Sequence, residues 1–473
     1  MGMEIHLHNT LTQSKDLFVP IEPGKVGLYT CGFTVYDYAH IGNLRSYIFA
    51  DVLKRTLTYA GYKVNHVENI TDVGHLVGDG DEGEDKMEVG SRKAGKSAWE
   101  IAKYFTEIFQ KDLLIANVLS PTVWAPATKY IPEQIEFIKV LEQKGFTYKI
   151  TDGIYFDTSK LSDYGKLAKL DAGGLKAGAR IGVNKEKKNI TDFALWKFSP
   201  NNEKRQMEWE SPWGVGFPGW HIECSAISTK FLGERFDIHT GGIDHIPVHH
   251  TNEIAQNKAR FGHKVVNVWL HHDFMTVSGT KMSKSLGNLY TLDDVEKRGF
   301  SPMALRYLYL GTHYRQKINF SWQSLEAAEN AYHKLIRQLA SISIPVPEVG
   351  PQGSPEVRPL NSLKSEFESA IADDLNTPKA LAVLWRVADL PAPASASPAY
   401  EFDKVLGLSL EKAVADYRFR QNDVPPEVKR FAREREEARK NQDWITADIL
   451  RERIATFGWA VEDSPEGPKL QRQ

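Results

Sequence analysis

The side chains that could bind a metal ion are concentrated in one part of the chain. The sequence contains only two cysteines, Cys31 and Cys224, and eight of its fifteen histidines lie within residues 221–272, close to Cys224. In the stretch VHHTNE, His249 and Glu253 are four residues apart, so they share one face of a helix. Two thiolates, an imidazole and a carboxylate are ligands that suit a tetrahedral zinc site.

Two alternatives to this ligand set stay open from the residues alone. His250 follows His249 directly and competes with it as the imidazole ligand. An isolated cysteine is also more often a small buried hydrophobic residue than a ligand, and no C-x-x-C pair marks a metal site in this chain.

A second group of residues could bind phosphate. In YAHIGNLR, His40, Gly42 and Asn43 stand between a predicted strand and a predicted helix. The N–H groups at a helix start attract anions, and Gly42 lets the backbone approach a ligand closely. His40 can donate a hydrogen bond to an anionic oxygen. The alternative interpretation is that His40 only caps the helix.

A third group lies in the loop GTKMSKSLGN, residues 279–288, which contains Lys281, Ser283 and Lys284. Two mobile ammonium groups can follow negative charge as it develops on a polyphosphate in a transition state. A pair of lysines on its own is more often a solvated basic loop, but the full string KMSKS is far more specific.

The elements that would position these groups follow from hydrophobic periodicity. The pattern predicts a strand over residues 25–33, a helix over 44–61 and a second strand over 62–71. Strand, helix and strand in this order form a βαβ unit, which implies a parallel sheet. Open parallel sheets bind ligands at the carboxyl ends of their strands, where Cys31 and the turn at His40 would lie.

The remaining chain is less regular. Residues 98–145 are predicted to be mainly helical, residues 146–210 to be short strands and loops, and both kinds of signal return over 211–310. Beyond them, stretches rich in Pro and Gly interrupt a helical region, and residues 425–457 form a charged helical segment. The stretch GVGFPG, residues 214–219, matches a dinucleotide fingerprint. A proline interrupts it and no clear helix is expected after it, so that function is not predicted.

The composition indicates a globular protein of several domains. At 473 residues the chain is too long for one hydrophobic core and predicts roughly two to four domains. It has no apolar run long enough for a membrane span, no signal-peptide pattern and too few cysteines for a disulfide framework. We therefore expect a cytoplasmic location and no membrane partner. The 59 Lys and Arg nearly balance the 61 Asp and Glu, which gives no support for RNA binding through a general positive field.

The motifs taken together resemble those of the class I aminoacyl-tRNA synthetases. The shared features are a histidine-glycine turn after the first strand and KMSKS far downstream. The stretches YTCGFTVYDYAHIGN, DFALWK, GWHIECSA, HHTNEIAQ and KMSKSLGN are together similar to the cysteinyl-tRNA synthetase family. The resemblance continues in ALRYLYL, DDLNTPKAL and EDSPEGPK, so it covers nearly the whole chain.

The resemblance implies an α/β fold with three parts. A Rossmann-like parallel-sheet catalytic domain with an inserted subdomain would be followed by an α-helical bundle and a small C-terminal α+β domain. The implied boundaries are residues 1–310 for the catalytic domain, 311–415 for a bundle that binds tRNA and 420–473 for an anticodon-binding domain. Within the catalytic domain, the inserted subdomain would take residues 115–210 and the segment carrying KMSKS residues 265–310.

The resemblance also implies roles for single residues. One zinc ion per chain would be held by Cys31, Cys224, His249 and Glu253, and it would select the thiol of the substrate. Thr71, Trp220 and Asp244 would line the pocket for the amino acid and its adenylate. ATP would be bound by His40, Gly42, Asn43, Lys281, Ser283 and Lys284. Of these, His40, Asn43, Lys281 and Lys284 would be catalytic.

The implied reaction is ATP-dependent ligation of L-cysteine to tRNA(Cys) through a cysteinyl-adenylate, with release of AMP and pyrophosphate. Mg²⁺ would accompany ATP, and the chain is expected to act as a monomer. Two rivals stay open: a cysteine ligase that transfers the same adenylate to a small amine, and a non-catalytic zinc- or thiol-binding paralogue. The long segment after residue 310 argues against the first rival, and the intact KMSKS argues against the second.

The sequence departs from the family pattern at a few positions. Phe33 stands where the family has proline, Phe217 where it has arginine, Thr251 where it has glutamate and Asp273 where it has glycine, while TDVGHL replaces an acidic stretch. No implied zinc ligand or loop lysine is lost, so we expect the reaction class to be retained.

In the C-terminal segment, basic residues from Lys429 to Lys440 alternate with glutamates that partly cancel their charge. One interpretation is a solvated helix held by Glu–Arg pairs. The interpretation that we prefer is a platform on which Trp444 and Trp459 stack with unpaired anticodon bases. Recognition of single-stranded loops by stacking needs less net charge than duplex binding does.

Overall fold

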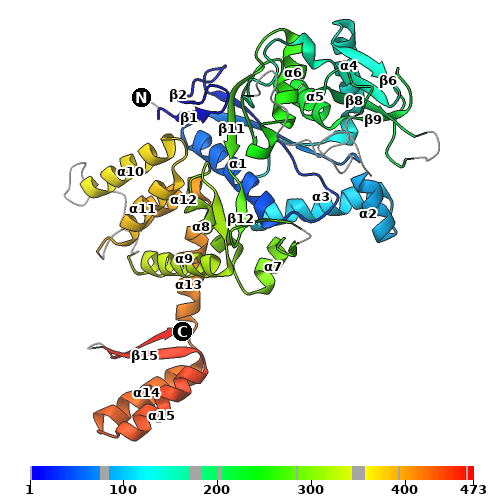
Figure 1. Cartoon of the computed structure of the whole chain (residues 1–473). Coiled ribbons are helices and arrows are strands. Elements are labelled where there is room, and N and C mark those ends of the chain that lie inside the picture. The colour runs from blue at the N-terminus through cyan, green and yellow to red at the C-terminus, as the bar shows by residue number, and fades with distance from the viewer. Residues whose placement is uncertain are drawn as a thin grey trace. The chain divides into compact units, whose positions relative to one another are not determined.

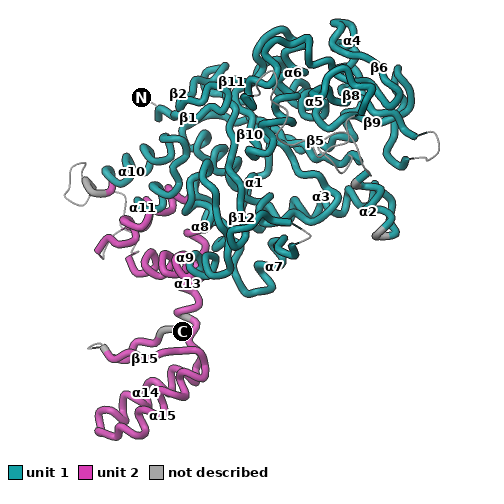
Figure 2. Tube along the Cα trace, in the orientation of Figure 1, with its two compact units in different colours: residues 1–329, 361–383, 404–408 teal, residues 330–360, 384–403, 409–473 magenta. Residues whose placement is uncertain are grey.

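The computed structural model describes residues 3–74, 85–169, 184–200, 205–283, 286–342, 357–391, 395–464 and 467–472. The chain divides into two compact units that interleave along the sequence (Figure 2). Unit 1 comprises residues 1–329, 361–383 and 404–408, and unit 2 comprises residues 330–360, 384–403 and 409–473. The domain boundaries expected from the sequence stay a prediction.

A five-stranded parallel sheet lies at the centre of unit 1 (Figure 1). Its order is β11 (Val266–His272), β10 (Phe236–Gly242), β3 (Lys25–Thr30), β4 (Lys63–Ile70) and β5 (Val123–Pro126). The predicted βαβ unit is confirmed, since β3 leads through α1 (Ile41–Tyr59) to β4, which pairs with it in parallel. Strand β5 falls in a region expected to be mainly helical, because four residues are too few for their periodicity to stand out.

The order of the strands places a reversal in the middle of the sheet. From β3 the chain winds to one side through β4 and β5, whereas β10 pairs with the other edge of β3 and leads through α6 (His249–Phe261) to β11. Helix α1 packs on β4 and β10, and α5 (Trp220–Leu232) packs on β3 and β4. A parallel sheet with such a reversal offers a crevice at the carboxyl ends of its central strands.

An antiparallel sheet is inserted between β5 and β10. It has the order β6 (Thr147–Ile150), β7 (Gly153–Phe156), β8 (Phe193–Phe198) and β9 (Gly216–Pro218), and α4 (Ile131–Gln143) packs on β6 and β9. Contrary to expectation, a helix does follow GVGFPG, since α5 begins at Trp220. A Cβ on Gly216 would lie 2.0 Å from the carbonyl oxygen of Lys197, so only a glycine lets β9 approach β8 this closely.

Smaller elements complete unit 1. A hairpin at the N-terminus is formed by β1 (His6–Asn9) and β2 (Ser14–Leu17), and the helices α2 (Lys86–Ala94) and α3 (Ala98–Ile115) follow β4. A third sheet has the order β13 (Thr280–Lys281), β12 (Met275–Val277) and β14 (Ile318–Phe320). The helices α7 (Leu292–Lys297) and α8 (Pro302–Leu310) lie between β13 and β14 in the chain.

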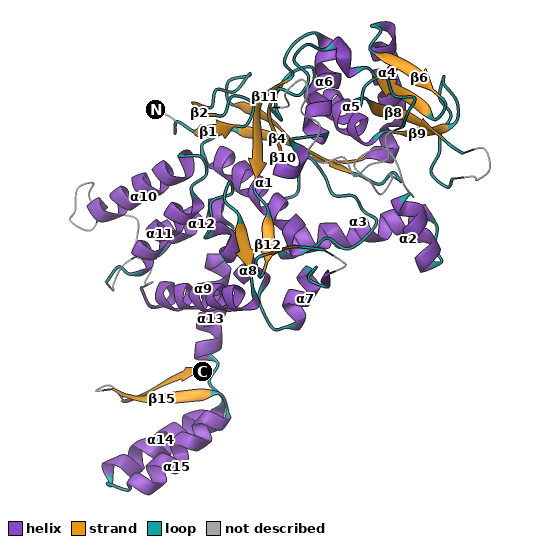
Figure 3. Cartoon of the chain, in the orientation of Figure 1, coloured by secondary structure: helices purple, strands orange, loops and turns teal. Residues whose placement is uncertain are grey.

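The C-terminal third is mainly helical, as expected. Its helices are α9 (Trp322–Ile342), α10 (Val357–Ala372), α11 (Thr377–Ala388), α12 (Ser397–Leu406) and α13 (Leu410–Asn422). The chain ends with α14 (Pro426–Lys440), α15 (Trp444–Thr456) and a hairpin of β15 (Trp459–Ser464) and β16 (Gly467–Arg472), shown in Figure 3. The predicted fold class, a parallel-sheet domain with an insertion, a helical bundle and a small α+β domain, is confirmed.

The last two helices and the hairpin share a small core of their own, which includes Phe431, Ile454 and Trp459. The exposed fraction of Trp459 is only 1%, so its expected role as a stacking platform is wrong. Trp444, at the start of α15, is 57% exposed and keeps that role as a prediction. In the described part of the chain, we find no helix that is long and apolar enough to cross a membrane.

Candidate active site

The four expected metal ligands converge behind the carboxyl edge of the parallel sheet. Cys31 follows the last residue of β3, Cys224 lies in α5, and His249 and Glu253 lie in the first turns of α6. All four are buried, and one ligand atom from each lies within 4.8 Å of the others. The Sγ atoms of Cys31 and Cys224 are 3.9 Å apart, and His249 Nε2 lies 3.1 Å from Glu253 Oε1.

A second set of four ligands overlaps with the first. Cys31 and Glu253 also lie within 4.8 Å of His239 and His250. His250 Nε2 is 3.3 Å from Cys31 Sγ, and His239 Nε2 is 3.0 Å from Glu253 Oε2. His249 and His250 therefore both lie close enough to Cys31 and Glu253 to bind a metal ion with them. The assignment of the ligands stays a proposal.

The outer nitrogens of both competing histidines have partners. His249 Nδ1 lies 3.0 Å from His221 Nδ1, and His250 Nδ1 lies 2.7 Å from His271 Nε2. His271 Nδ1 is in turn 2.8 Å from the hydroxyl of Thr10. Such outer hydrogen bonds fix the orientation of an imidazole that serves as a metal ligand.

The two thiols of the first set differ. Burial and the neighbouring Cys224 raise the pKa of Cys31 well above its usual range. Burial opposes a thiolate at Cys224, but the hydrogen bond from Cys31 and the charge of His249 bring its pKa to about 7. Burial also opposes the charge on His249, yet Cys224 and Glu253 raise its pKa to about 10. The pKa of Glu253 is held well below its usual range by His239 and His249, against the effect of burial. A thiolate and a carboxylate held ready in a buried site are donors suited to Zn²⁺.

A cavity of about 370 Å³ opens onto this cluster. Its walls contain Cys31, Cys224 and His249 together with Asn43, Thr71, Trp220 and Asp244, so seven expected site residues meet there. Thr71 follows β4 and Asp244 follows β10, as the position at the carboxyl edge of the sheet requires. The Trp220 ring lies over the His249 ring, with their centroids 4.3 Å apart.

Asn69 and His245 are among the cavity residues that were not expected from the sequence. Asn69 accepts a hydrogen bond from the Gly32 N–H at 2.8 Å and donates one to the Thr71 hydroxyl at 3.0 Å, which ties β3 to β4 at the cavity. His245 borders the cavity, and burial lowers its pKa to about 4. Its Nδ1 atom has no hydrogen-bond partner in the described part of the chain. An isolated Asn or His carries no periodicity, so neither had a sequence signal.

Gly32 shows why glycine must follow Cys31. A Cβ at this position would lie 1.5 Å from the carbonyl oxygen of Asn69, so any other residue would push β3 away from β4. The expected ligand Cys31 and the cavity residue Thr71 depend on this close approach, because they follow the ends of these two strands.

The expected phosphate turn is a reciprocal helix cap. His40 Nδ1 accepts a hydrogen bond from the Asn43 N–H at 3.1 Å, and Asn43 Oδ1 accepts one from the His40 N–H at 3.0 Å. Burial lowers the pKa of His40 to about 4, so its ring is neutral near pH 7. Because Nδ1 is the acceptor, Nε2 carries the proton and can donate to an anion. The cap and the phosphate role are therefore compatible.

The KMSKS loop lies beside this turn. A Cβ on Gly42 would lie 3.1 Å from Met282 Sδ, and the Ile41 N–H donates to the Tyr290 carbonyl at 2.8 Å. Lys281 is exposed at the end of β13, and the Ser283 N–H donates to Asn288 Oδ1 at 2.8 Å. Lys284 lies outside the described residues.

The four single-residue departures from the family pattern have local contacts. Phe33 packs against Phe109, with ring centroids 5.3 Å apart. The guanidinium carbon of Arg205 lies 3.4 Å from the centroid of the Phe217 ring. The Thr251 hydroxyl donates to the Ile246 carbonyl at 2.7 Å, and the Asp273 carbonyl accepts from Arg45 at 2.7 Å. None of these contacts involves an expected zinc ligand.

Family models match most of the chain. Residues 17–330 match the class I (C) tRNA synthetase catalytic domain, residues 366–390 the DALR domain and residues 421–469 the cysteinyl-tRNA ligase anticodon binding domain. Cysteine--tRNA ligase 1 of Burkholderia lata is 50% identical over 99% of this chain and 97% of that protein. Cysteine--tRNA ligase of Treponema denticola is 42% identical over 98% of both.

Solved structures share the fold at low identity. A methionyl-tRNA synthetase of Mycobacterium tuberculosis in complex with methionyl-adenylate has a TM-score of 0.54 at 14% identity, over 83% of this chain and 90% of that one. A LeuRS of Agrobacterium radiobacter in a ternary complex has a TM-score of 0.58 at 13% identity, over 84% and 85%. The match to the catalytic-domain model and the two cysteine--tRNA ligases that are 50% and 42% identical over nearly the whole chain agree with this fold. The chain therefore belongs to the cysteinyl-tRNA synthetase family.

Proposed function

We propose that this chain attaches L-cysteine to tRNA(Cys) in two ATP-dependent steps. The observation that carries the proposal is the convergence of Cys31, Cys224, His249 and Glu253 on a cavity at the carboxyl edge of the sheet. Gly42, in the capped turn at His40, lies near Met282 of the KMSKS motif, and Asn43 of the same turn lines the cavity. A buried thiolate-rich cluster in an amino-acid pocket fits selection of a substrate thiol.

The donor set fits Zn²⁺, and we assign it to Cys31, Cys224, His249 and Glu253 in preference to the overlapping set. Both sulfur atoms belong to this set, and Cys31, Cys224 and His249 border the cavity. A zinc ion bound there would supply a soft Lewis acid that prefers a thiolate to a hydroxyl group. Shape alone separates cysteine from serine poorly, because the two are nearly isosteric.

The residues of the chain supply positioning and charge stabilisation. The Asp244 carboxylate, exposed at the cavity, is placed to hold the substrate ammonium group, and Trp220 forms a wall beside it. The neutral His40 would donate its Nε2–H to a phosphate oxygen, with the N–H groups at the start of α1. Lys281 and Lys284 would follow the charge that develops on the pyrophosphate, with Mg²⁺ accompanying ATP.

The two steps need no covalent bond to the protein. A carboxylate oxygen of cysteine attacks the α-phosphorus of ATP, and the bond to the leaving pyrophosphate breaks, which gives cysteinyl-adenylate. A ribose hydroxyl at the end of the tRNA then attacks the cysteinyl carbonyl, loses its proton and displaces AMP. Holding the reacting atoms in line accounts for much of such catalysis.

The C-terminal domain is the proposed site of anticodon binding. Trp444 is exposed on α15 with the guanidinium of Arg439 5.6 Å from its ring centroid, so a flat base could stack there. The net charge of the chain is −2, which makes a general electrostatic attraction to RNA a minor contribution. We also propose that the enzyme works as a monomer in the cytoplasm.

Aminoacylation with purified components tests the proposal. The full chain, ATP, Mg²⁺ and radiolabelled cysteine should charge tRNA(Cys), and serine at the same concentration should give no detectable product. Pyrophosphate exchange that depends on cysteine, without charging of tRNA, would instead indicate transfer to a small amine. Absence of exchange in a zinc-loaded, folded sample would indicate a non-catalytic binding protein.

A further inference from the structure

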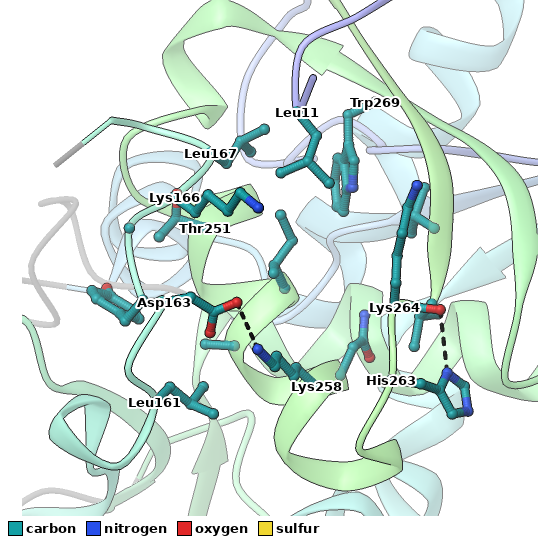
Figure 4. Close-up of a pocket in the computed structure, with 17 residues that line it drawn as sticks. Leu11, Leu161, Asp163, Lys166, Leu167, Thr251, Lys258, His263, Lys264 and Trp269 are labelled. Atoms are coloured by element: carbon teal, nitrogen blue, oxygen red, sulfur yellow. Dashed lines mark hydrogen bonds and ion pairs between the residues drawn. The ribbon is translucent and has the colours of Figure 1, made fainter. Parts of the chain in front are cut away.

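A second cavity lies behind helix α6, and no residue proposed for the reaction lines it (Figure 4). Its volume is about 210 Å³, and it is bounded by the β1–β2 turn, residues 161–167, α6 and the start of β11. Thr251, Ile254 and Lys258 form its α6 wall, at the spacing of one helical stripe. The same helix presents His249 to the catalytic cavity.

The inner wall of this rear cavity is apolar. Leu167, Val265, Val266 and Trp269 each expose less than 5% of their surface and line it, and Leu11 closes the side formed by the N-terminal hairpin. Interiors are close-packed and contain few voids larger than a water molecule. An apolar space of this size therefore favours an apolar occupant over bulk water.

The rim of the rear cavity is positively charged. Its described lining residues include three lysines, Lys166, Lys258 and Lys264, and one acid, Asp163. Asp163 forms an ion pair with Lys258 at 2.6 Å. Lys166 and Lys264 have no hydrogen bond or ion pair through their ammonium groups with any residue that the structure describes. Figure 4 shows both side chains extending along the cavity wall.

Two polar groups of the cavity, one exposed and one buried, agree with a bound ligand. Lys264 is exposed, yet partial burial lowers its pKa, although the charge of Asp16 acts against this. Asn257 lines the cavity, exposes 3% of its surface, and its Oδ1 atom has no hydrogen-bond partner in the described part of the chain. Buried amide oxygens without a partner are costly, and a donor on a ligand would satisfy this one.

From these contacts we infer that the rear cavity binds a small amphipathic anion. Its flat apolar body would lie against Leu167 and Trp269, its anionic group between Lys166 and Lys264, and a hydrogen-bond donor near Asn257. Anion pairing with Lys166 and Lys264 supplies affinity, and the apolar wall supplies selectivity for a ring over a free phosphate.

An occupant of this cavity would touch the surroundings of the metal cluster. Trp269 stacks on His239 with ring centroids 4.6 Å apart, and His239 is 3.0 Å from Glu253. A ligand packed against Trp269 would thus be one ring away from His239 and would influence its position. Because coupling between two sites is reciprocal, saturation with cysteine and ATP should alter the affinity for the anion as well.

A fluorescent anion of the right shape tests the inference. The probe 8-anilinonaphthalene-1-sulfonate has apolar rings, a sulfonate and one N–H donor, and N-phenyl-1-naphthylamine is its counterpart without the sulfonate. We expect saturable binding of the sulfonate at one site on the full chain, about tenfold tighter than binding of the neutral compound. The double variant Lys166→Glu/Lys264→Glu should weaken sulfonate binding by about tenfold or more and leave the neutral compound unaffected.

Matched variants make the result decisive. Lys103→Glu, an exposed lysine on α3, is the control for general charge and should bind the sulfonate like the parent. Lys166→Gln/Lys264→Gln removes the two charges without reversing them and should give an intermediate affinity. Cysteine-dependent pyrophosphate exchange shows that each variant is folded. Equal sulfonate affinity in the parent and the double variant, or equal affinity for the two compounds, would overturn the inference.

Discussion

Cys31 and Glu253 each belong to two possible ligand sets, and this overlap is the main feature of the site at the scale of single residues. One ion cannot use both sets at once, because only four positions surround a tetrahedral zinc. The set with Cys224 and His249 has two sulfur ligands and borders the catalytic cavity. In the other set, His239 is stacked against Trp269, away from that cavity.

Four single variants separate the two sets. We expect Cys224→Ala and His249→Ala to lose the zinc ion, since each removes a ligand, whereas His239→Ala and His250→Ala keep it. The measurement is zinc content by elemental analysis after dialysis against a weak chelator, with melting temperature as the control for folding. Loss of zinc in His250→Ala with retention in His249→Ala would assign the metal to the other set.

At the scale of elements, the N-terminus of α1 combines a cap with a ligand-binding edge. The hydrogen bonds between His40 and Asn43 satisfy backbone groups that a helix start leaves unpaired. They also fix the imidazole so that its Nε2–H is free to meet an anion. Asn43 takes part in this cap and lines the catalytic cavity as well.

Substitutions at Asn43 should separate these two roles. Asn43→Ala removes the acceptor for the His40 N–H and is expected to cost about 1 kcal/mol of stability and to lower kcat/KM for ATP. Asn43→Asp keeps the acceptor, so the urea midpoint should stay near that of the parent, while the added negative charge still weakens the ATP step. Urea denaturation and pyrophosphate exchange measure the two effects. A normal exchange rate in Asn43→Asp would leave Asn43 with the capping role alone.

The two tryptophans of the C-terminal domain should behave in opposite ways. Trp444→Ala removes an exposed ring, so the melting temperature should hold while KM for tRNA rises roughly fivefold or more, given the usual strength of base stacking. Trp459→Ala removes a buried side chain and should destabilise the domain by about 3–5 kcal/mol. Circular dichroism melts and charging kinetics measure both. An unchanged KM in Trp444→Ala would exclude this ring from RNA binding.

At the scale of the whole molecule, we propose that chemistry and RNA recognition are carried by separate parts of the chain. Every residue proposed for ATP, cysteine and zinc lies before residue 290. The last two helices and the hairpin have their own core, formed by residues such as Val428, Phe431 and Ile454. A segment with its own core can be removed without exposing the core of the catalytic unit.

Deletion of residues 424–473 should therefore leave adenylate formation nearly intact and reduce tRNA charging sharply. Pyrophosphate exchange and aminoacylation, measured with the same preparations, give the two rates. A truncated chain that charges tRNA as efficiently as the full chain would show that this domain is not an anticodon-binding module.

Stability of the catalytic unit should depend on pH through buried neutral histidines. Burial lowers the pKa of His66 to about 3, whereas in the unfolded chain it is near 6.5. Between these values only the unfolded state binds the proton, so His66 contributes a loss of stability as pH falls below 6.5, up to about 1.4 kcal/mol per pH unit. His66→Gln should flatten the fall of the urea midpoint between pH 6.5 and 4.5. Equal slopes in both proteins would contradict a buried neutral His66.

Much of this protein could be predicted from local sequence. The periodicity of residues 25–71 determined the βαβ unit, because alternation and helical spacing report which side of an element is buried. The types of the ligands were also visible, since thiol, imidazole and carboxylate groups are rare in such a combination. The motif strings indicated the family, and the relatives confirm it.

Other features were decided only by tertiary structure. The pairing of β10 with β3 and the packing of α5 on β3 and β4 bring the candidate ligands of α6 and Cys224 to Cys31, and no local pattern records such distant contacts. The second ligand set exists because β10 places His239 opposite α6. Trp444 and Trp459 look alike in the sequence, yet one is exposed on a helix and the other fills a core. Burial depends on what the rest of the chain packs against a residue, whereas the sequence near that residue specifies only its chemistry and its local backbone preference.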